Sequence, residues 1–285
     1  MAAKPSIAIV GPGRLGSALA LELKRAGYPI SGVLSHPGME SQRKARALAR
    51  KIHAPALTGH DLPLTADVVW FCVPDGDIAT VARQLAAGSQ WRGKIAFHSS
   101  GALPSDQLDV VRKQGASVAS VHPLMTFVAG SAPSLEGVPF AVEGDDAAVR
   151  LARTIVRGLG GETFAIRKRY KAAYHAWGGF TSPLVVAALV AAEQVARAAG
   201  LSAAEARRRM LPIVRQTIAN YARLGPAGAF SGPLVRGDAE VVRRHLQALK
   251  SLPDAREVYL ALSKMAVRHL PVRKRAQLAR VLKIR

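Results

Sequence analysis

The chain has 285 residues, and its 40 Lys and Arg against 19 Asp and Glu give a formal net charge of +21 at pH 7. This length suits one large domain or two ordinary domains that each bury a core. The single cysteine excludes a disulfide framework and a thiolate zinc site, and we expect no metal centre. We also expect a cytoplasmic protein, because an apolar run follows Lys4 at once and leaves no room for a secretory signal.

The positive charge lies mainly in the second part of the chain. Residues 1–165 hold 17 basic and 13 acidic side chains, whereas residues 166–285 hold 23 basic and 6 acidic ones. Such a field could steer anionic substrates, attract nucleic acid nonspecifically, or keep the protein soluble. No aromatic platform or recognition helix accompanies the charge, so we expect no specific nucleic-acid partner.

The first motif is a glycine-rich turn between a strand and a helix. The apolar run at residues 7–10 predicts a strand, and the amphipathic residues 15–26 predict a helix. Three glycines at the spacing G-x-G-x-x-G allow a tight turn, close approach of the backbone to a diphosphate, and close packing of the helix on the sheet. The free amides and positive dipole end of the helix would hold the diphosphate. The cofactor contacts predicted here are Gly11, Gly13, Arg14, Leu15 and Gly16.

The second strand, at residues 30–34, bears on which dinucleotide binds. An NAD site usually places an acid about 20 residues after the glycines, but this chain has no acid between Glu22 and Glu40. The strand ends instead in Ser35 and His36, and cations follow at Arg43, Lys44 and Arg46. These groups suit a 2′-phosphate, which a carboxylate would repel. We therefore predict NADP(H), held here by Ser35, His36 and Arg43; the cations could equally be the solvated face of a surface helix at residues 39–51.

The next strand, at residues 68–73, ends in Val73, Pro74 and Asp75. Ligands bind outside the carboxyl ends of parallel strands, so we expect Val73 and Pro74 to line the cofactor cleft. Asp75 or Asp77 is more simply explained as a cap of the helix at residues 78–87 than as a catalyst. Cys72 lies inside this strand and reads as a small core residue.

Two further strands deliver polar groups to the same edge of the sheet. The strand at residues 94–98 runs into Ser99, Ser100 and Gly101, and the strand at residues 117–121 runs into His122. Strands at residues 138–142 and 162–166, with a helix at 145–159 between them, complete a doubly wound parallel sheet in a domain of residues 1–165. Residues 166–285 then form an all-helical domain.

An uncharged stretch opens the helical part. Residues 172–192 carry no formal charge, but polar residues, Gly178, Gly179 and Pro183 interrupt the run, so we expect no membrane span. A helix that is apolar around most of its circumference should be buried at a domain or subunit interface, and the two glycines and the proline predict a kink. We therefore expect a homodimer formed through the helical domain.

Later helices carry clear start signals. Ser202 and Glu205 form a capping box before a helix at residues 206–223, and Asp238 can cap a helix at residues 241–250. Another helix opens at residues 254–257. The last segment, residues 263–285, holds eight basic and no acidic side chains, and its interleaved apolar residues favour a docked amphipathic tail over a nucleic-acid arm.

Several motifs together resemble one family. They are Gly11-x-Gly13-x-x-Gly16, Val73-Pro74-Asp75, His98-Ser99-Ser100-Gly101, His122-Pro123-Leu124, Tyr174-His175-Ala176, Ser231-Gly232-Pro233 and Arg236-Gly237-Asp238. This set resembles the bacterial proteins that join an NADP-binding Rossmann domain to the domain of unknown function 2520. The resemblance covers nearly the whole chain and implies a dimeric NADP-dependent oxidoreductase, similar in architecture to pyrroline carboxylate reductase, ketopantoate reductase and the phosphogluconate dehydrogenases. In the family the helix after Tyr174-His175 continues to an Asn, where this chain has Gly178, Gly179 and Pro183.

The predicted reaction is hydride transfer between NADP(H) and a small anionic carbonyl or imine substrate. His175 and Lys171 share one helix face, and we favour His175 as the proton donor because its ordinary pKa lies near neutrality. His122, Ser99 and Ser100 would orient the substrate, and Arg236 could clamp a carboxylate. Two other functions stay open: an NADP(H)-binding sensor or scaffold without activity, suggested by the altered helix, and a nucleic-acid-binding protein, suggested by the basic second part.

Overall fold

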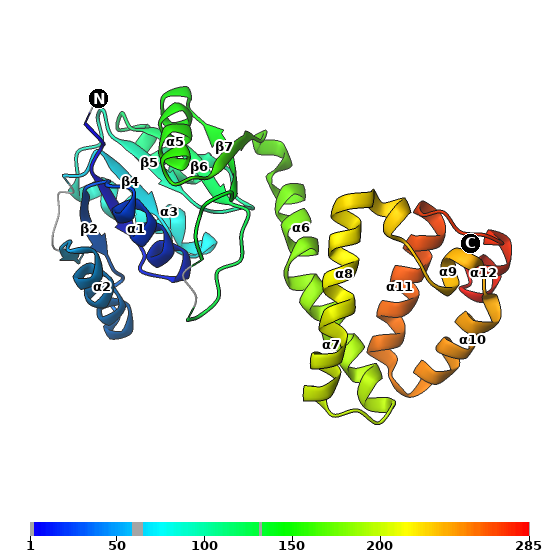
Figure 1. Ribbon diagram of the computed structural model, residues 1–285. Coiled ribbons are helices and arrows are strands. Elements are labelled where there is room, and N and C mark those ends of the chain that lie inside the picture. The colour runs from blue at the N-terminus through cyan, green and yellow to red at the C-terminus, as the bar shows by residue number, and fades with distance from the viewer. Residues whose placement is uncertain (1–2, 59–64, 131–132, 285) are drawn as a thin grey trace. The chain divides into compact units, whose positions relative to one another are not determined.

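The computed structural model describes residues 3–58, 65–130 and 133–284. The chain forms two compact units, Met1–Gly179 and Phe180–Arg285, the first built around a sheet and the second from helices (Figure 1). The fold class predicted from the sequence is therefore confirmed. The domain boundary predicted after residue 165 lies earlier in the chain than the boundary between the two units, which follows Gly179. The difference arises because most of the first helix beyond the sheet belongs to the first unit.

The described part of the first unit contains a sheet of eight strands. Their order across the sheet is β3-β2-β1-β4-β5-β6-β7-β8, so the order reverses between β1 and β4. The strands are β1 Ile7–Val10, β2 Ile30–Leu34, β3 Ala56–Leu57, β4 Val68–Phe71, β5 Ile95–His98, β6 Ser117–Pro123, β7 Pro139–Gly144 and β8 Glu162–Ala165. Of these, only the two-residue edge strand β3 was not expected from the sequence.

The sequence predicted a parallel sheet, but one pair of strands in the observed sheet is antiparallel. Strands β1 to β6 are parallel, but β7 pairs antiparallel with β6, with His122 opposite Ala141. The reason lies in the connection: the described residues between β6 and β7 hold no helix, and a parallel pair needs a crossover that is usually helical. β8 then pairs parallel with β7.

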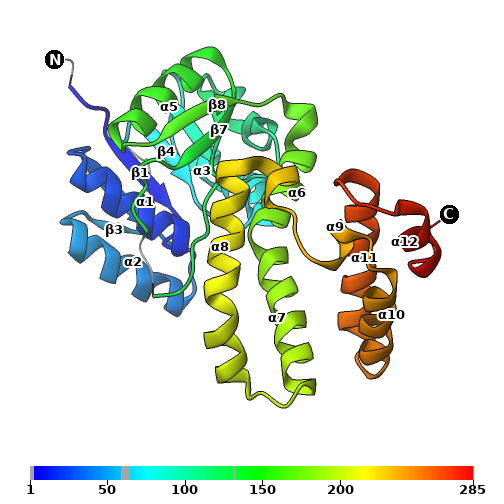
Figure 2. The same ribbon diagram turned by 45° about the vertical axis from the view of Figure 1, so that its right-hand side comes forward.

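Helices cover both faces of the sheet, as Figures 1 and 2 show. One buried cluster contains residues of α1, α2 and α5, and the other contains residues of α3 and α4. These helices are α1 Arg14–Arg25, α2 Met39–Ile52, α3 Ile78–Gly88, α4 Asp109–Arg112 and α5 Asp146–Gly158. The strands between the two layers alternate their side chains, with Ile7 and Ile9 in the first cluster and Ala8 and Val10 in the second.

The predicted aspartate cap of α3 is confirmed in position only: Asp77 is the N-cap residue, without a side-chain capping bond. Asp75–Asp77 form a short 3-10 turn, η1, that leads directly into α3, and neither aspartate caps the helix by a side-chain hydrogen bond. Instead, the Asp77 amide donates to the Pro74 carbonyl at 2.9 Å. The turn thus satisfies backbone groups at the start of α3 that a side-chain cap would otherwise satisfy.

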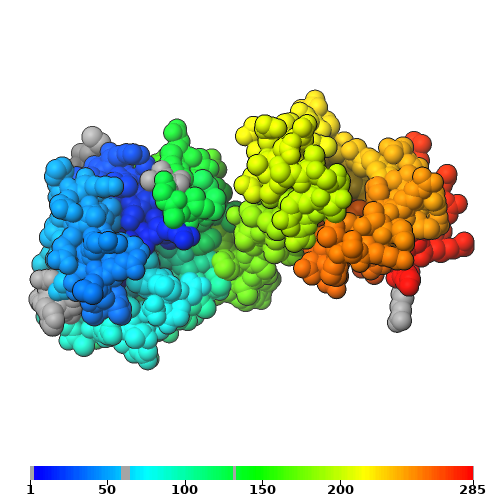
Figure 3. Space-filling model, turned by 90° about the horizontal axis from the view of Figure 1, so that it is seen from below, coloured from blue at the N-terminus to red at the C-terminus, as the bar shows by residue number. Residues whose placement is uncertain are grey.

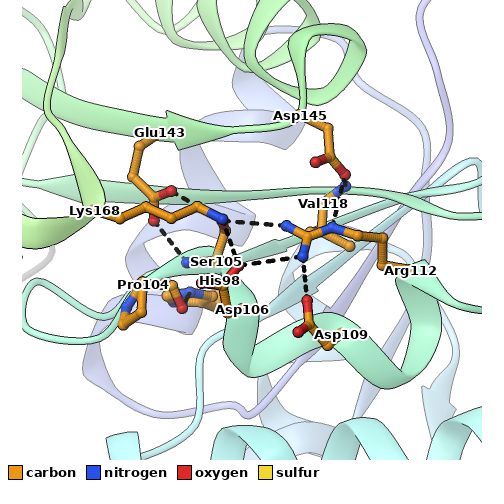
Figure 4. A network of polar contacts seen from close by, with 10 residues as sticks. All are labelled: His98, Pro104, Ser105, Asp106, Asp109, Arg112, Val118, Glu143, Asp145 and Lys168. Carbon is orange, nitrogen blue, oxygen red and sulfur yellow. Dashed lines mark hydrogen bonds and ion pairs between the residues drawn. The ribbon is translucent and has the colours of Figure 1, made fainter.

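A polar network fixes the start of α6, Lys171–Thr181, against the sheet (Figure 4). Two 3-10 turns meet there: η2, Ser105–Leu108, and η3, Lys168–Tyr170, which leads into α6. Lys168 pairs with Asp106 of η2, and Arg112 Nε bonds to Asp145 at 3.1 Å. Because the two turns are joined by an ion pair, the first turn of α6 is held near the ends of β5 and β6.

The second unit begins with a helical hairpin, α7 Pro183–Ala198 and α8 Ala203–Ala229, whose helices lie side by side in both ribbon views. The predicted kink is present as a break at Ser182, after which Pro183 starts α7. The predicted capping box of Ser202 and Glu205 is confirmed. At Gly225, whose φ is +67°, α8 kinks again.

The remaining helices form a small core of their own. They are α9 Pro233–Arg236, α10 Ala239–Ala248, η4 Leu249–Ser251, α11 Pro253–His269 and α12 Arg275–Val281. Val242, Val267, Leu278 and Leu282 are buried together, so the basic C-terminal tail is docked, as predicted; its last part is red in Figure 3, beside orange segments of the same unit. Asp238 precedes α10 but makes no capping bond, because its carboxylate pairs with Arg236.

Candidate functional site

The glycine turn between β1 and α1 is shaped to admit a diphosphate. Gly11 has φ +103°, and a Cβ there would lie 2.7 Å from the carbonyl oxygen of Cys72. A Cβ on Gly16 would lie 2.0 Å from the Gly11 carbonyl oxygen, so only glycine lets α1 pack this close to the turn. Gly13 is the N-cap of α1 and has no side chain to satisfy the first amides of the helix, which are left for an anion.

A cleft of about 640 Å³ lies beside this turn, at the point where the strand order reverses. Dinucleotides bind at such a reversal in doubly wound sheets. Its lining includes Gly11, Pro12, Gly13, Ser35, His36, Cys72, Val73 and Pro74. Arg14 and Leu15 are not in the lining; they start α1.

The end of β2 forms the far wall of the cleft. Ser35 is almost fully buried, and His36 is exposed with its Nδ1 accepting from the Gly38 amide at 3.4 Å. Lys44 lines the cleft, paired with Glu40, whereas Arg43 lines a shallow pocket on another side of α2. The contact predicted for Arg43 stays a prediction, and Lys44 is a cation of α2 that lines the same cleft as Ser35 and His36.

A second group of side chains meets at the carboxyl ends of β5 and β6. His122 Nδ1 shares a hydrogen bond of 2.7 Å with the Tyr174 hydroxyl, and the rings of His122 and His175 lie edge to face at 6.0 Å. Gly101 fits against both imidazoles: a Cβ there would lie 2.5 Å from His175 Cδ2 and 2.8 Å from His122 Nε2. The structure therefore brings the two predicted histidines together.

Lys171 lies beneath this group and is buried, at 1% exposure. Its Nζ donates to the Ser100 carbonyl oxygen at 2.7 Å and to the Ser120 hydroxyl. Burial lowers the pKa of Lys171 to about 8, although Glu143 and Asp75 act in the opposite direction. At neutral pH the site thus holds a buried cation whose hydrogen-bond partners are neutral.

The histidines around the lysine are held uncharged. His98 is fully buried, accepts from the Ser100 amide at Nδ1 and bonds the Pro104 carbonyl through Nε2. Burial and the nearby Lys171 lower the pKa of His98 to about 3, and burial, Lys171 and His175 lower that of His122 to about 4. Both rings are therefore neutral at physiological pH, and His175 is the exposed histidine beside them.

The predicted substrate-binding hydroxyls already have partners within the chain. Ser99 Oγ accepts from the Trp70 indole at 2.8 Å, and Ser100 Oγ accepts from the amides of Ala102 and Leu103. Arg236 belongs to the second unit, where its guanidinium bonds Asp238 at 2.8 Å. Substrate contacts from these three residues stay predictions.

Sequence reasoning did not single out Tyr174 or Ser120 as site residues. Tyr174 lies three residues after Lys171, so the helical period that linked Lys171 to His175 also brings Tyr174 to that side. Ser120 pairs with His98 across β5 and β6, a register that becomes visible only once the strands are aligned.

Models of two protein families match the chain. Residues 1–123 match a Rossmann-like domain, and residues 138–266 match the domain of unknown function 2520. No curated protein matches it.

Solved structures share the fold over nearly the whole chain. A protein from Bacteroides fragilis assigned as an NADP oxidoreductase is 22% identical, with a TM-score of 0.76 over 92% of this chain and 97% of that one. A protein from Thermotoga maritima is 25% identical, with a TM-score of 0.71 over 97% and 98%. A reductive aminase from Aspergillus terreus, solved with NADPH and ethyl-5-oxohexanoate, is 19% identical, with a TM-score of 0.66 over 97% and 99%. With both domains matched in order, the chain belongs to the proteins that join a Rossmann-like domain to the domain of unknown function 2520.

Proposed function

We propose that the chain is an NADPH-dependent oxidoreductase that transfers a hydride between the cofactor and a small, anionic carbonyl or imine substrate. One observation carries the proposal: the glycine turn and the cluster of Lys171, His122 and His175 belong to one sheet-containing unit, at the carboxyl ends of its strands. Ligands bind at that edge in doubly wound sheets. The reductive aminase with the same fold, solved with NADPH, supports the choice of cofactor.

The residues of the cleft fit such a cofactor. The Gly11 to Gly16 turn and the first amides of α1 would hold the diphosphate, and Ser35, His36 and Lys44 would face the 2′-phosphate. Val73 and Pro74 would line the path between the two halves of the cofactor. When bound, NADPH supplies the hydride.

The chain's own groups would handle the proton and the charge. His175 would donate the proton, because it is exposed beside His122, whose ring is neutral. Tyr174 would orient His122 through their shared hydrogen bond.

Cofactor choice provides the test. NADPH should bind at least about tenfold more tightly than NADH, a difference of about 1.4 kcal/mol, because Ser35 stands where an acid would bind the ribose. Ser35→Asp should reverse the preference, and Ser31→Asp, earlier in the same strand, serves as the control. Titration calorimetry that gave equal affinities for the two cofactors would contradict the assignment. Tight NADPH binding without turnover of any oxo acid or imine would favour a sensor instead.

A further inference from the structure

One backbone amide in the loop after β5 stands apart from its neighbours. The Ser100 amide donates to His98 Nδ1 at 3.1 Å, and the Ala102 and Leu103 amides donate to Ser100 Oγ at 3.2 and 2.9 Å. Gly101 is buried between them, yet among the hydrogen bonds of the described residues its N–H has no acceptor. A buried N–H without an acceptor is costly, so this group points to a ligand that accepts from it.

Lys171 binds the carbonyl oxygen of the peptide group that joins Ser100 to Gly101. Its Nζ and the Ser120 hydroxyl both donate to the Ser100 carbonyl oxygen, at 2.7 and 3.1 Å. The C=O and N–H of a planar trans peptide point in opposite directions, so the Gly101 N–H faces away from the lysine. A cation on the carbonyl polarises the peptide and makes that N–H a stronger donor.

The imidazoles of His122 and His175 lie on the side of Gly101 where a Cβ would be. A Cβ on Gly101 would lie 2.8 Å from His122 Nε2, so this nitrogen is within a few ångströms of the glycine. Tyr174 engages the other nitrogen of His122, Nδ1. When the Tyr174 hydroxyl donates to Nδ1, the neutral ring carries its proton on Nε2, and Nε2–H and the Gly101 N–H are then two neighbouring donors with no acceptor among the described residues.

The charge around this point is positive. Glu143 and Asp75 are the carboxylates that act on Lys171, but Glu143 is engaged by the amide and hydroxyl of Ser105 at 2.6 and 2.9 Å (Figure 4). Among the described residues, no carboxylate forms an ion pair with Lys171. The neutral rings of His98 and His122 carry no charge that could offset the charge of Lys171. The lysine thus lacks a directly bonded counter-ion.

We propose that the Gly101 amide, His122 Nε2 and the Lys171 cation behind them form an oxyanion site, and that the substrate is a carbonyl compound rather than a protonated imine. This inference rests on the proposed function and narrows its substrate class. The carbonyl carbon gains the hydride that NADPH supplies, the C=O π pair moves onto oxygen, and the oxygen takes the proton that His175 donates, to give an alcohol and NADP⁺. Lys171 is a positioning residue here, because it acts through the peptide.

The same field disfavours imine reduction. A ketone gains negative charge on oxygen during hydride transfer, which fixed donors and a nearby cation stabilise. A protonated imine enters with positive charge, and Lys171 would oppose its binding. The reductive aminase with the same fold therefore need not share this chain's substrate class.

The test uses sodium oxalate, a small planar anion with oxo-acid oxygens, titrated calorimetrically into the protein saturated with NADP⁺. Oxalate should bind more tightly than the cation pyrrolidinium. Lys171→Met should weaken oxalate binding at least about 100-fold, the scale of losing an oxyanion donor, and Lys171→Arg should restore much of it. Arg167→Met removes an exposed cation from the same segment and serves as the matched control.

The pH profile gives a readout that needs no variant. Since burial lowers the pKa of Lys171 to about 8, oxalate affinity should be full below that pH and fall as the pH rises through it. Repeating the profile in His175→Ala separates the lysine from the neighbouring imidazole; His98 and His122 stay neutral, and the pKa of Tyr174 is raised to about 12 by burial.

Tighter binding of pyrrolidinium than of oxalate would overturn the proposal. So would oxalate affinity that survives Lys171→Met or that does not change across pH 8. A protein that fails to bind NADP⁺ at all would instead contradict the proposed function, so the two failures are distinguishable.

Discussion

The histidine pair is the part of the site where single residues matter most. His122 is fixed by Tyr174 and neutral, whereas His175 is exposed and makes only a ring contact with it. His175→Ala should therefore lower turnover by about 10² to 10⁴, the usual contribution of a general acid. NADPH affinity should stay within a few fold, because the glycine turn is untouched.

His269→Ala, an exposed histidine at the end of α11, is the control for losing an imidazole. Steady-state kinetics and NADPH titration of both variants check the expectation. Full turnover in His175→Ala would mean that a bound water or Lys171, and not His175, donates the proton.

At the scale of elements, the contact between the turn and α1 is tight. A Cβ on Gly16 would meet the Gly11 carbonyl oxygen, which is backbone and cannot rotate away. Gly16→Ala should force α1 outward, lower the free energy of unfolding by about 1 to 3 kcal/mol, and weaken NADPH binding. Gly76→Ala is the matched control, since nothing lies within 4 Å of a Cβ there. Thermal melts with and without NADPH decide the matter; equal behaviour of the two variants would show that the turn is not this close.

The sequence predicted most elements because their signals are local. Short runs of apolar residues marked β1 and β4, and the capping box marked the start of α8. The antiparallel β7 could not be predicted, since its direction depends on an irregular connection rather than on its own residues. Asp77 stands at the predicted N-cap position, but α3 is entered from a 3-10 turn and the side chain makes no capping bond.

The candidate site was predicted only in part. His122, His175 and Lys171 share strand ends and one helix turn, so position in the pattern was enough to find them. The sequence predicted a contact from the Ser100 hydroxyl, whereas the backbone contacts needed the structure: the Ser100 carbonyl binds Lys171, and the Gly101 amide has no acceptor among the described residues. The type of a residue does not show which hydrogen bonds its backbone groups will make.

At the scale of the whole molecule, the uncharged stretch remains exposed. No residue of α7 is buried within the chain, and Phe180 and Val186 are 69% and 58% exposed. The segment Lys168–Ala198 is also long and apolar enough to cross a membrane by length and composition alone. We infer that a second copy of the chain covers this surface, because apolar patches of this size mark interfaces.

Light scattering should then give the mass of a dimer, and Val186→Glu should shift it to a monomer. Met39→Glu, which changes an exposed apolar residue of the first unit, should leave the dimer intact. A monomeric wild-type protein, or one that partitions into lipid vesicles, would count against the dimer.

The central claim is that this site transfers a hydride from NADPH to a substrate. An isotope label on the transferred hydrogen tests this claim most directly. The protein would be given NADPH deuterated at C4 of the nicotinamide, on either face, together with a mixture of small oxo acids and cyclic imines. Mass spectrometry should find one reduced product that carries deuterium, formed by the wild-type protein and strongly reduced in His175→Ala. If NADPH binds but deuterium reaches no component of the mixture, the chain is a cofactor-binding protein and not the oxidoreductase proposed here.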